Sequence, residues 1–423
     1  MKLSQWNALD RMEEDMFLDT IRQINIQYKA FVPSSINHNW DFNEREVNDI
    51  LATSEEAMQA ITRLDDRIYS ITDAGILNQE AIIRMIANKE SNESSVIEGT
   101  QTMIEDAFAD LKLLPPEKRE NAEELQNYIK ALDYGIDLLK ILPLCERLIK
   151  DIHKQLMSGV RGEKKQPGQF KDKQNYIAQS KTDDISKAIF VPPQAKYTAE
   201  LMHDLFSLAN QEQYRPSQKL VIIALLHYQF ETIHPFNDGN GRIGRMIIIL
   251  YLMQHKIINS KGIYLSAYFQ KHRDRYYTYL TDIRNSSYDL TLFGHEELSR
   301  TKQKEHFYNI QKWISFFLQG LKETANDGLK VINSSIGLKR KYLEIITKNA
   351  KDQREENTMK AILDAMFEKP FFTAKELCDL SKSSMPSVNK TLERFISLNV
   401  IKETTGYKRN RNYTLWEFVE LFR

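Results

Sequence analysis

The chain has 423 residues, of which 42% are hydrophobic and 27% charged, a composition typical of a globular protein long enough for two or three domains. Lys and Arg together number 58, and so do Asp and Glu, so the net charge argues neither for a nucleic-acid coat nor for a trap for acidic substrates. Cys145 and Cys378 provide no disulfide or zinc framework, and the apolar runs are too short to span a bilayer. We therefore expect a cytoplasmic protein with reduced cysteines.

Helical patterns run through most of the chain. Residues 1–105 have apolar residues mostly three and four apart, as in NEREVNDILATSEEAMQAITRLDDRIYSI, and predict an N-terminal helical region. The pattern continues over residues 106–330, for example in SQKLVIIALLHYQFETI. A charged linker helix is expected over residues 331–354 and a smaller module over residues 355–423. The predicted fold class is mainly α, with a helical core, one short β-hairpin and a C-terminal winged helix-turn-helix domain.

The predicted hairpin lies where SKAIFVPPQAKY interrupts the helical pattern. Ile189, Phe190 and Val191 favour a strand, and Pro192 and Pro193 end it. We expect this hairpin to lie over a site.

The segment HPFNDGNGRIGR, residues 234–245, contains three of the chain's 15 glycines. Pro235 disfavours helical geometry at His234, so the imidazole should be presented on a turn. Around Asn240, the flanking glycines can reach left-handed conformations that let successive N–H groups converge, and the next helix begins there. The N-terminus of that helix would attract an anion.

Charged residues of the same segment would complete a polyphosphate site. Arg242 and Arg245 are three apart, so their guanidinium groups share a helix face and can both bind phosphate oxygens. Asp238 offers a hard oxygen ligand for a divalent ion such as Mg²⁺. Each feature alone also suits an ordinary turn, a helix cap or a solvated ion pair. Their convergence within twelve residues predicts the phosphate site.

HPFNDGNGR with a second arginine three residues later resembles the Fic-domain signature HxFx(D/E)GNGRxxR. The segments PGQFKDKQNYIAQ, AIFVPPQ and RDRYYTYL also look like Fic counterparts, so the resemblance covers most of residues 60–300. Fic proteins are mainly helical enzymes that transfer AMP from ATP to a hydroxyl group of a target protein and release pyrophosphate. Some members transfer other phosphate-containing groups, so the resemblance constrains the reaction class better than the donor.

The resemblance implies a role for each residue of the loop. His234 would be the general base that takes the proton of the attacking Ser, Thr or Tyr hydroxyl, a task that suits an imidazole. Asp238 would hold Mg²⁺ against the α- and β-phosphates of ATP.

The remaining loop residues would bind the phosphates themselves. Arg242 would bind the outgoing phosphates and Arg245 the γ-phosphate. The expected anion hole consists of Gly239, Asn240 and Gly241.

Two further elements receive expected roles. The hairpin at Ile189, Phe190 and Val191 would act as a flap that pairs with an extended segment of the target through main-chain bonds. Tyr276 and Tyr277 are candidates for the adenine pocket, and equally for ordinary aromatic residues of an amphipathic helix.

Residues 94–99, SSVIEG, match the Fic inhibitory motif (S/T)xxxE(G/N) through Ser94, Glu98 and Gly99. A bidentate pair between Glu98 and Arg245 would occupy the donors meant for the γ-phosphate and make the enzyme self-inhibited. The same glutamate could instead position a water molecule for AMP removal. Taken alone, the string also fits an exposed helix end at which the glycine stops the helix.

The C-terminal sequence predicts a helix, a turn, a second helix and two short strands, the order of a winged helix. Lys408, Arg409 and Arg411 would lie on the wing, where basic residues suit DNA phosphates. Residues 357–423 contain only 11 basic against 8 acidic residues, so protein docking or formation of a homodimer is the alternative.

Two functions follow from the sequence. The first is a self-inhibited protein AMP-transferase acting on a target protein or on itself. The second is a nucleotide-responsive DNA-binding regulator. His234 favours the first, because a nucleotide sensor has no need of a base.

Overall fold

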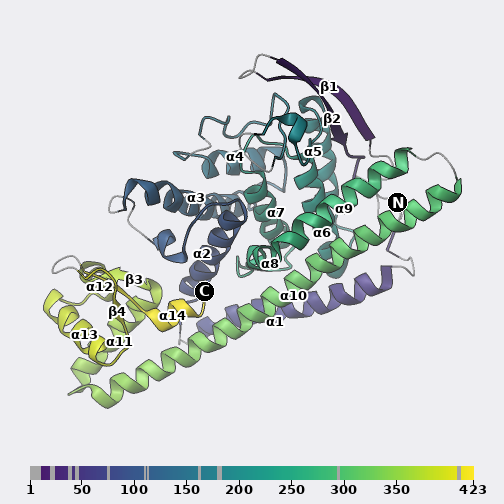
Figure 1. Ribbon diagram of the computed structural model, residues 1–423. Helices are drawn as coiled ribbons and strands as arrows, with labels where there is room; N and C mark the ends of the chain where they lie inside the picture. The colour runs from purple at the N-terminus through teal and green to yellow at the C-terminus, as the bar shows by residue number, and fades with distance from the viewer. Residues whose placement is uncertain are drawn as a thin grey trace.

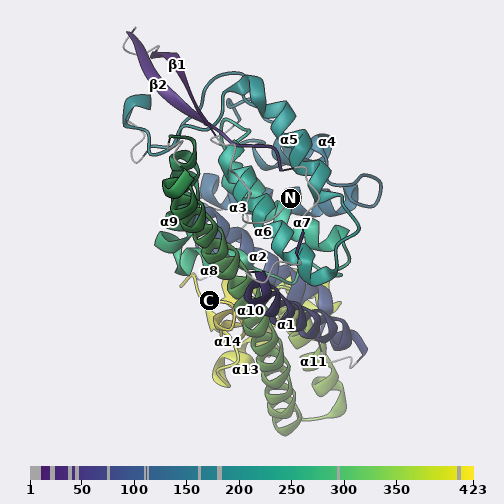
Figure 2. The same ribbon diagram turned by 90° about the vertical axis from the view of Figure 1, so that its right-hand side faces the viewer.

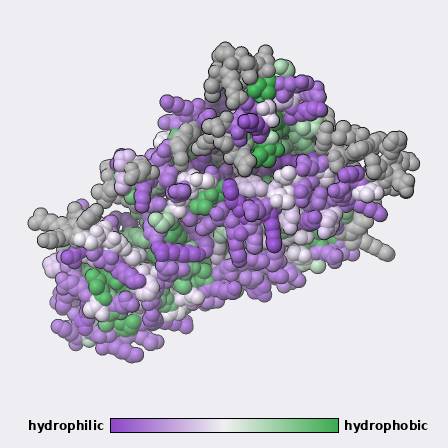
Figure 3. Space-filling view, in the orientation of Figure 1, coloured by the Kyte–Doolittle hydropathy of each residue, from purple (hydrophilic) through white to green (hydrophobic). Residues whose placement is uncertain are grey.

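The structure is a computed structural model, and it describes residues 11–19, 24–36, 41–42, 47–73, 77–108, 111, 114–160, 163–178, 183–292, 296–406 and 411–423. It is mainly helical, as predicted, with two small antiparallel sheets among the described residues (Figure 1). No described helix combines the length and hydropathy needed to cross a bilayer. The face shown in Figure 3 is mostly hydrophilic, with small apolar patches.

Two buried helices form the centre of the molecule. They are α6 (Pro216–Ile233) and α7 (Asn240–Gln254), and the residues of both are buried over almost their whole length. Both are apolar around most of their circumference, which is why they take the core positions. Around them lie α3 (Pro116–Leu138), α4 (Glu146–Leu156), α5 (Ala195–Ala209), α8 (Leu265–Lys271), α9 (Arg273–Leu292) and the short 3₁₀ helices η3 (Ile104–Phe108) and η5 (Ile185–Lys187).

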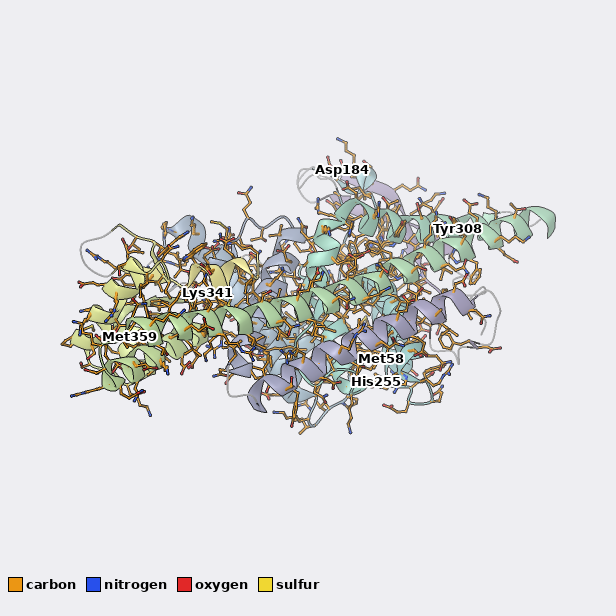
Figure 4. The ribbon with its side chains drawn as sticks, turned by 90° about the horizontal axis from the view of Figure 1, so that it is seen from below. Met58, Asp184, His255, Tyr308, Lys341 and Met359 are labelled. Carbon is orange, nitrogen blue, oxygen red and sulfur yellow. The ribbon has the colours of Figure 1, made fainter. Side chains whose placement is uncertain are left out.

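Three further helices enclose one side of this core. The longest, α10 (Glu296–Asn349), runs beside α1 (Asn48–Asp73), as Figures 2 and 4 show. The two are parallel, because Lys322 of α10 contacts Glu56 while Asn333 contacts Arg67. Helix α2 (Gln79–Ile97) packs between α3 and α8. The segment predicted as a linker helix is, up to Asn349, the continuous C-terminal part of α10.

The N-terminal region is not wholly helical, and the prediction of helix is wrong for residues 11–19 and 24–32. Strands β1 (Arg11–Asp19) and β2 (Ile24–Val32) form an antiparallel hairpin with Arg11 opposite Val32. The sequence INIQYKAFV alternates apolar and polar residues over its first half, which is the strand pattern. The hairpin reaches the predicted flap, since the Phe31 N–H donates to Val191 O (2.9 Å).

The C-terminal module follows α10 in the order α11 (Gln353–Glu368), β3 (Phe371–Thr373), α12 (Ala374–Ser381), α13 (Met385–Ser397), β4 (Lys402–Glu403), β5 (Asn412–Thr414) and α14 (Trp416–Glu420). Its strands pair in the order β3-β5-β4. Its identity as a winged helix stays a prediction. Of the three wing residues, Lys408 and Arg409 lie outside the described residues, and Arg411 is exposed.

Candidate functional site

His234 stands at the end of α6 in a left-handed conformation, with φ 48° and ψ 61°. Its Nδ1 atom has no hydrogen-bond partner among the described residues. Burial, followed by the positive charges of Lys171 and Arg284, lowers the pKa of His234 from 6.5 to about 3. The imidazole is therefore neutral near pH 7 and has one unprotonated ring nitrogen.

The loop after His234 is held in shape by its own side chains and by α4. The amide of Asn240 bonds the backbone of Phe236 twice, with Oδ1 accepting from N (2.8 Å) and Nδ2 donating to O (2.8 Å). The ring of His153 stacks on Phe236 at 3.8 Å. Gly239 has φ 75°, and an added Cβ would lie 3.0 Å from Met157 Sδ. Asn240 thus shapes the predicted anion hole with both ends of its side chain.

The N-terminus of α7 faces the carboxylate of Glu98. An added Cβ at Gly241 would clash with Glu98 Oε1, so only glycine leaves room for this approach. Helix N-termini attract anions because their amides are unpaired and the helix dipole is positive there. Glu98, the residue that caps the C-terminal end of α2, places its carboxylate where the sequence predicts a phosphate.

Arg245 joins α7 to α2. Its side chain is 2% exposed, and its Nη2 donates to Glu98 Oε1 (2.7 Å). Its Nε and Nη2 also donate to Ser94 Oγ (2.8 Å) and Ser94 O (2.9 Å). The expected bidentate pair with Glu98 is therefore replaced by a guanidinium shared between Glu98 and Ser94, because the serine lies one helical turn earlier on α2. Ser94 and Glu98 act on the same cation.

Arg242 is buried and only loosely paired. Its Nη1 lies 3.6 Å from Glu124 Oε2, and its Nη2 lies 3.7 Å from Asp238 Oδ1. Nε and Nη1 have no hydrogen-bond partner among the described residues. Buried N–H groups without partners are costly, so this guanidinium is suited to an incoming anion.

Asp238 is the residue that could hold a divalent ion. Its side chain is 45% exposed, and its Oδ1 accepts the Gly239 N–H (2.6 Å). The described residues contain no cluster of three His, Cys, Asp or Glu side chains able to enclose a metal. A single exposed carboxylate fits Mg²⁺, which commonly takes its other ligands from phosphate groups and water.

The predicted flap and the tyrosines lie on the α9 side of the loop. Phe190 pairs with Ile177 through an isolated β-bridge, and the guanidinium of Arg284 lies 3.9 Å from the Phe190 ring centroid. Tyr276 is 1% exposed, and its hydroxyl contacts His227 Nε2 (2.9 Å). Tyr276 is therefore packed in the core.

Tyr277 differs from its neighbour. It is 41% exposed, and its ring lies 5.3 Å from the guanidinium of Arg273. Of the two predicted adenine-pocket residues, only Tyr277 presents an open ring, and the adenine role of the pair stays a prediction.

The sequence analysis did not single out several buried polar residues around the loop. Lys171 and Asn175 contact its backbone, and Arg284 approaches it from α9. Glu231 lies one turn before His234 with its Oε1 unpartnered among the described residues, and burial raises its pKa from 4.5 to about 7. The presence of a carboxylate inside the apolar run of α6 was the sequence signal that could have identified Glu231.

Comparison with known proteins agrees with this geometry. A family model described as Fic/DOC family matches residues 143–252, which include the whole loop, and one described as Fic/DOC family N-terminal matches residues 51–137. A solved structure of a Fic family protein from Desulfovibrio desulfuricans G20 superposes with a TM-score of 0.51 at 17% identity, covering 86% of this chain and 95% of that one. Residues 51–137 and 143–252 are thus similar in sequence to the Fic/DOC family, and the fold is shared with a solved Fic family structure.

Curated relatives match shorter stretches. Protein adenylyltransferase Fic of Aedes aegypti is 27% identical over 44% of this chain and 34% of its own length. Protein adenylyltransferase fic-1 of Caenorhabditis elegans is 30% identical over 18% of this chain and 15% of its own length. The chain thus aligns with about a third or less of these relatives.

Proposed function

We propose that this chain is a self-inhibited protein adenylyltransferase that moves AMP from ATP to a Ser, Thr or Tyr hydroxyl of a target protein or of itself. One observation supports this most directly. The carboxylate of Glu98 lies at the N-terminus of α7 and bonds Arg245, so an anion of the protein occupies a helix N-terminus whose chemistry suits a phosphate.

In the proposed reaction the target hydroxyl oxygen attacks the α-phosphorus of ATP. A bond forms between that oxygen and phosphorus, while the bond from phosphorus to the pyrophosphate oxygen breaks. His234 accepts the hydroxyl proton, which its neutral imidazole allows. Arg242, whose Nε and Nη1 have no hydrogen-bond partner among the described residues, stabilises the departing pyrophosphate. Mg²⁺ at Asp238 would neutralise phosphate charge.

Glu98 inhibits this reaction by holding the cation that the γ-phosphate needs. Arg245 is buried and already bonded to Ser94 and Glu98, so ATP in its productive position would have to displace the carboxylate. A charge-assisted hydrogen bond contributes roughly 1.5–3 kcal/mol, or about 10- to 100-fold in the population of the open site. Removing Glu98 should raise transfer by about that factor.

The test is transfer of label from α-³²P-ATP with Mg²⁺ to the protein itself and to proteins of a lysate. Glu98→Gly should label strongly, and Glu98→Gly/His234→Ala should not. Glu80→Gly, the same substitution at the other end of α2, controls for loosening of the helix and should stay at the parent level. Absence of transfer by Glu98→Gly, with ATP bound, would contradict the proposal.

A further inference from the structure

His234 has a backbone conformation that two local effects oppose. A positive φ is uncommon for a residue with a side chain, and a following proline pushes a residue toward extended geometry. His234 nevertheless has φ 48° before Pro235. A disfavoured conformation persists only where the surrounding structure imposes it, and such positions cluster at functional sites.

The surrounding structure here is the segment 163–178, which lies about sixty residues earlier in the sequence. Two of its residues, Lys171 and Asn175, bond four successive carbonyl groups around His234. These bonds run from Lys171 Nζ to Ile233 O (3.1 Å), from Asn175 Nδ2 to His234 O (2.9 Å), from Lys171 N to Pro235 O (2.8 Å) and from Asn175 Nδ2 to Phe236 O (2.9 Å). Every carbonyl of the turn is therefore fixed from one side.

Lys171 is also an unusual buried cation. It is 3% exposed, and the acceptors described for its ammonium are both neutral, namely Ile233 O and Asn175 Oδ1 (2.9 Å). Burial lowers the pKa of Lys171 from 10.5 to about 7. Keeping an ammonium group buried without a carboxylate is costly, which is more common at functional positions than in an ordinary core.

The charge of Lys171 acts on the imidazole of His234. Lys171 from the segment 163–178 and Arg284 from α9 both disfavour the imidazolium form, and Glu231 is the titratable group of α6 nearest in sequence. Burial is the main cause of the lowered pKa of His234, and the positive charges of Lys171 and Arg284 lower it further.

We propose that Lys171 and Asn175 are positioning residues for His234, fixing the left-handed turn that presents the imidazole, and that the Lys171 ammonium, when protonated, disfavours the imidazolium form. The inference rests on the proposed function, in which His234 is the base. The guanidinium groups of Arg242 and Arg245 make none of these bonds, so loss of either residue should affect the proton acceptor more than the arginine donors for ATP.

The test measures steady-state transfer in the Glu98→Gly background. Asn175→Asp keeps the size of the side chain but removes both donors, and Lys171→Met removes the charge and the Nζ bonds. A displaced base of about 1 Å lowers the rate roughly 100-fold, so kcat should fall about 10- to 100-fold while KM for ATP stays within about twofold. Asn349→Asp is the matched control, because its Nδ2 bonds a backbone carbonyl, Ile345 O (2.8 Å), at the end of α10 and outside the loop, and its kcat should be unchanged.

A second readout does not need transfer. The His234 imidazole signals in NMR spectra are assigned by their loss in His234→Ala and followed against pH. Lys171→Met should raise the pKa of His234, because one of two facing cations is gone, and Asn175→Asp should shift the ring signals at every pH. Asn349→Asp should change neither.

The outcomes separate the two proposals. A rise in KM with unchanged kcat in both variants, or unchanged imidazole signals in both, would overturn the positioning role while Glu98→Gly transfer upholds the function. Failure of Glu98→Gly itself to transfer AMP would contradict the proposed function. The NMR titration would still show whether Lys171 and Asn175 determine the pKa and the surroundings of the His234 imidazole.

Discussion

At the scale of the residue, a side chain at position 241 and the carboxylate of Glu98 would need the same space. A Cβ at Gly241 would clash with Glu98 Oε1 and would lie 3.0 Å from Arg245 Nη1. The glycine is therefore needed for close approach of the carboxylate to the helix N-terminus rather than for a left-handed turn, since Gly241 lies inside α7.

The effect of Gly241→Ala on stability should therefore depend on whether Glu98 is present. Gly241→Ala should lower the free energy of unfolding by about 1–3 kcal/mol in the parent chain, because the methyl group overpacks the contact. In the Glu98→Gly background the clash is absent, and alanine should be neutral or stabilising by up to about 1 kcal/mol through helix propensity. Urea unfolding of the four proteins measures the coupling.

A matched glycine is available as a control. Gly337 lies inside α10, and an added Cβ there meets no atom within 4 Å. Gly337→Ala should stabilise both backgrounds equally. An equal loss for Gly241→Ala with and without Glu98 would show that the carboxylate does not lie against the helix N-terminus.

The burial of the Glu231 carboxyl group predicts that the stability of the protein depends on pH. Burial raises its pKa from 4.5 to about 7, so the folded protein keeps the proton over a range in which the unfolded chain has released it. The contribution of Glu231 to the free energy of unfolding is complete below pH 4.5, and it falls by up to about 3 kcal/mol as the pH rises to 7.

Replacing this carboxyl group by an amide should remove that loss. The free energy of unfolding of Glu231→Gln should therefore exceed that of the parent by more at pH 8 than at pH 5. Urea unfolding at both pH values measures this difference. Parallel pH profiles of the two proteins would mean that Glu231 ionises in the fold as it does in the unfolded chain.

At the scale of the element, local signals predicted the helix boundaries around the loop better than the contacts that the loop makes with distant segments. Pro235 and the glycines correctly indicated that α6 ends before the loop and that α7 begins at Asn240, because these effects act within a few residues. Gly99, with φ 86°, likewise follows the end of α2. Contacts from distant segments had no such signal, and Lys171 and Glu124 reach the loop from more than sixty residues away.

The N-terminal hairpin was missed for a different reason. Its alternating pattern in β2 was present in the sequence, but residues 1–105 were interpreted as one helical region. Pairing with the flap also helps to fix the strand, through the Phe31 N–H and through the Phe31 and Phe190 rings, whose centroids are 5.9 Å apart. A hairpin that is stabilised by tertiary contacts needs only a weak local pattern.

At the scale of the whole molecule, the C-terminal module lies against the helix that bears Ser94 (Figure 1). The guanidinium of Arg423 pairs with Glu105 in η3, and Lys89 Nζ of α2 donates to Arg423 O (3.3 Å). The rings of Phe108 and Phe371 lie 5.3 Å apart. The proposed inhibitory motif, residues 94–99, thus has contacts with the module on both sides, at Lys89 before it and at Glu105 after it.

These contacts affect the position of Glu98 at the end of α2, because a helix moves largely as a rigid body. The module is itself held to α10 by the ion pair of Lys341 with Glu417 (2.7 Å). Loosening the module at Arg423 should therefore let α2 and η3 shift together, and the Glu98–Arg245 contact at the end of α2 should open more often.

Charge reversal at Arg423 measures that coupling. Partly exposed ion pairs contribute about 0.2–1 kcal/mol, so Arg423→Glu should raise AMP transfer by roughly two- to fivefold over the parent. Glu105→Arg should do the same, and the double variant should return toward the parent rate because the pair is restored with its charges exchanged. Lys140→Glu, which disrupts an exposed pair with Asp137 away from α2, should leave transfer unchanged.

The Glu98→Gly background gives the decisive comparison. Once the carboxylate is absent, the position of α2 no longer controls access to Arg245, so Arg423→Glu should add nothing to the rate of Glu98→Gly. An increase that persists in this background would mean that the module acts on the loop by another route. An unchanged rate in the parent background would mean that the Glu98–Arg245 contact is held by α3 and α8, between which α2 is packed, without help from the C-terminal module.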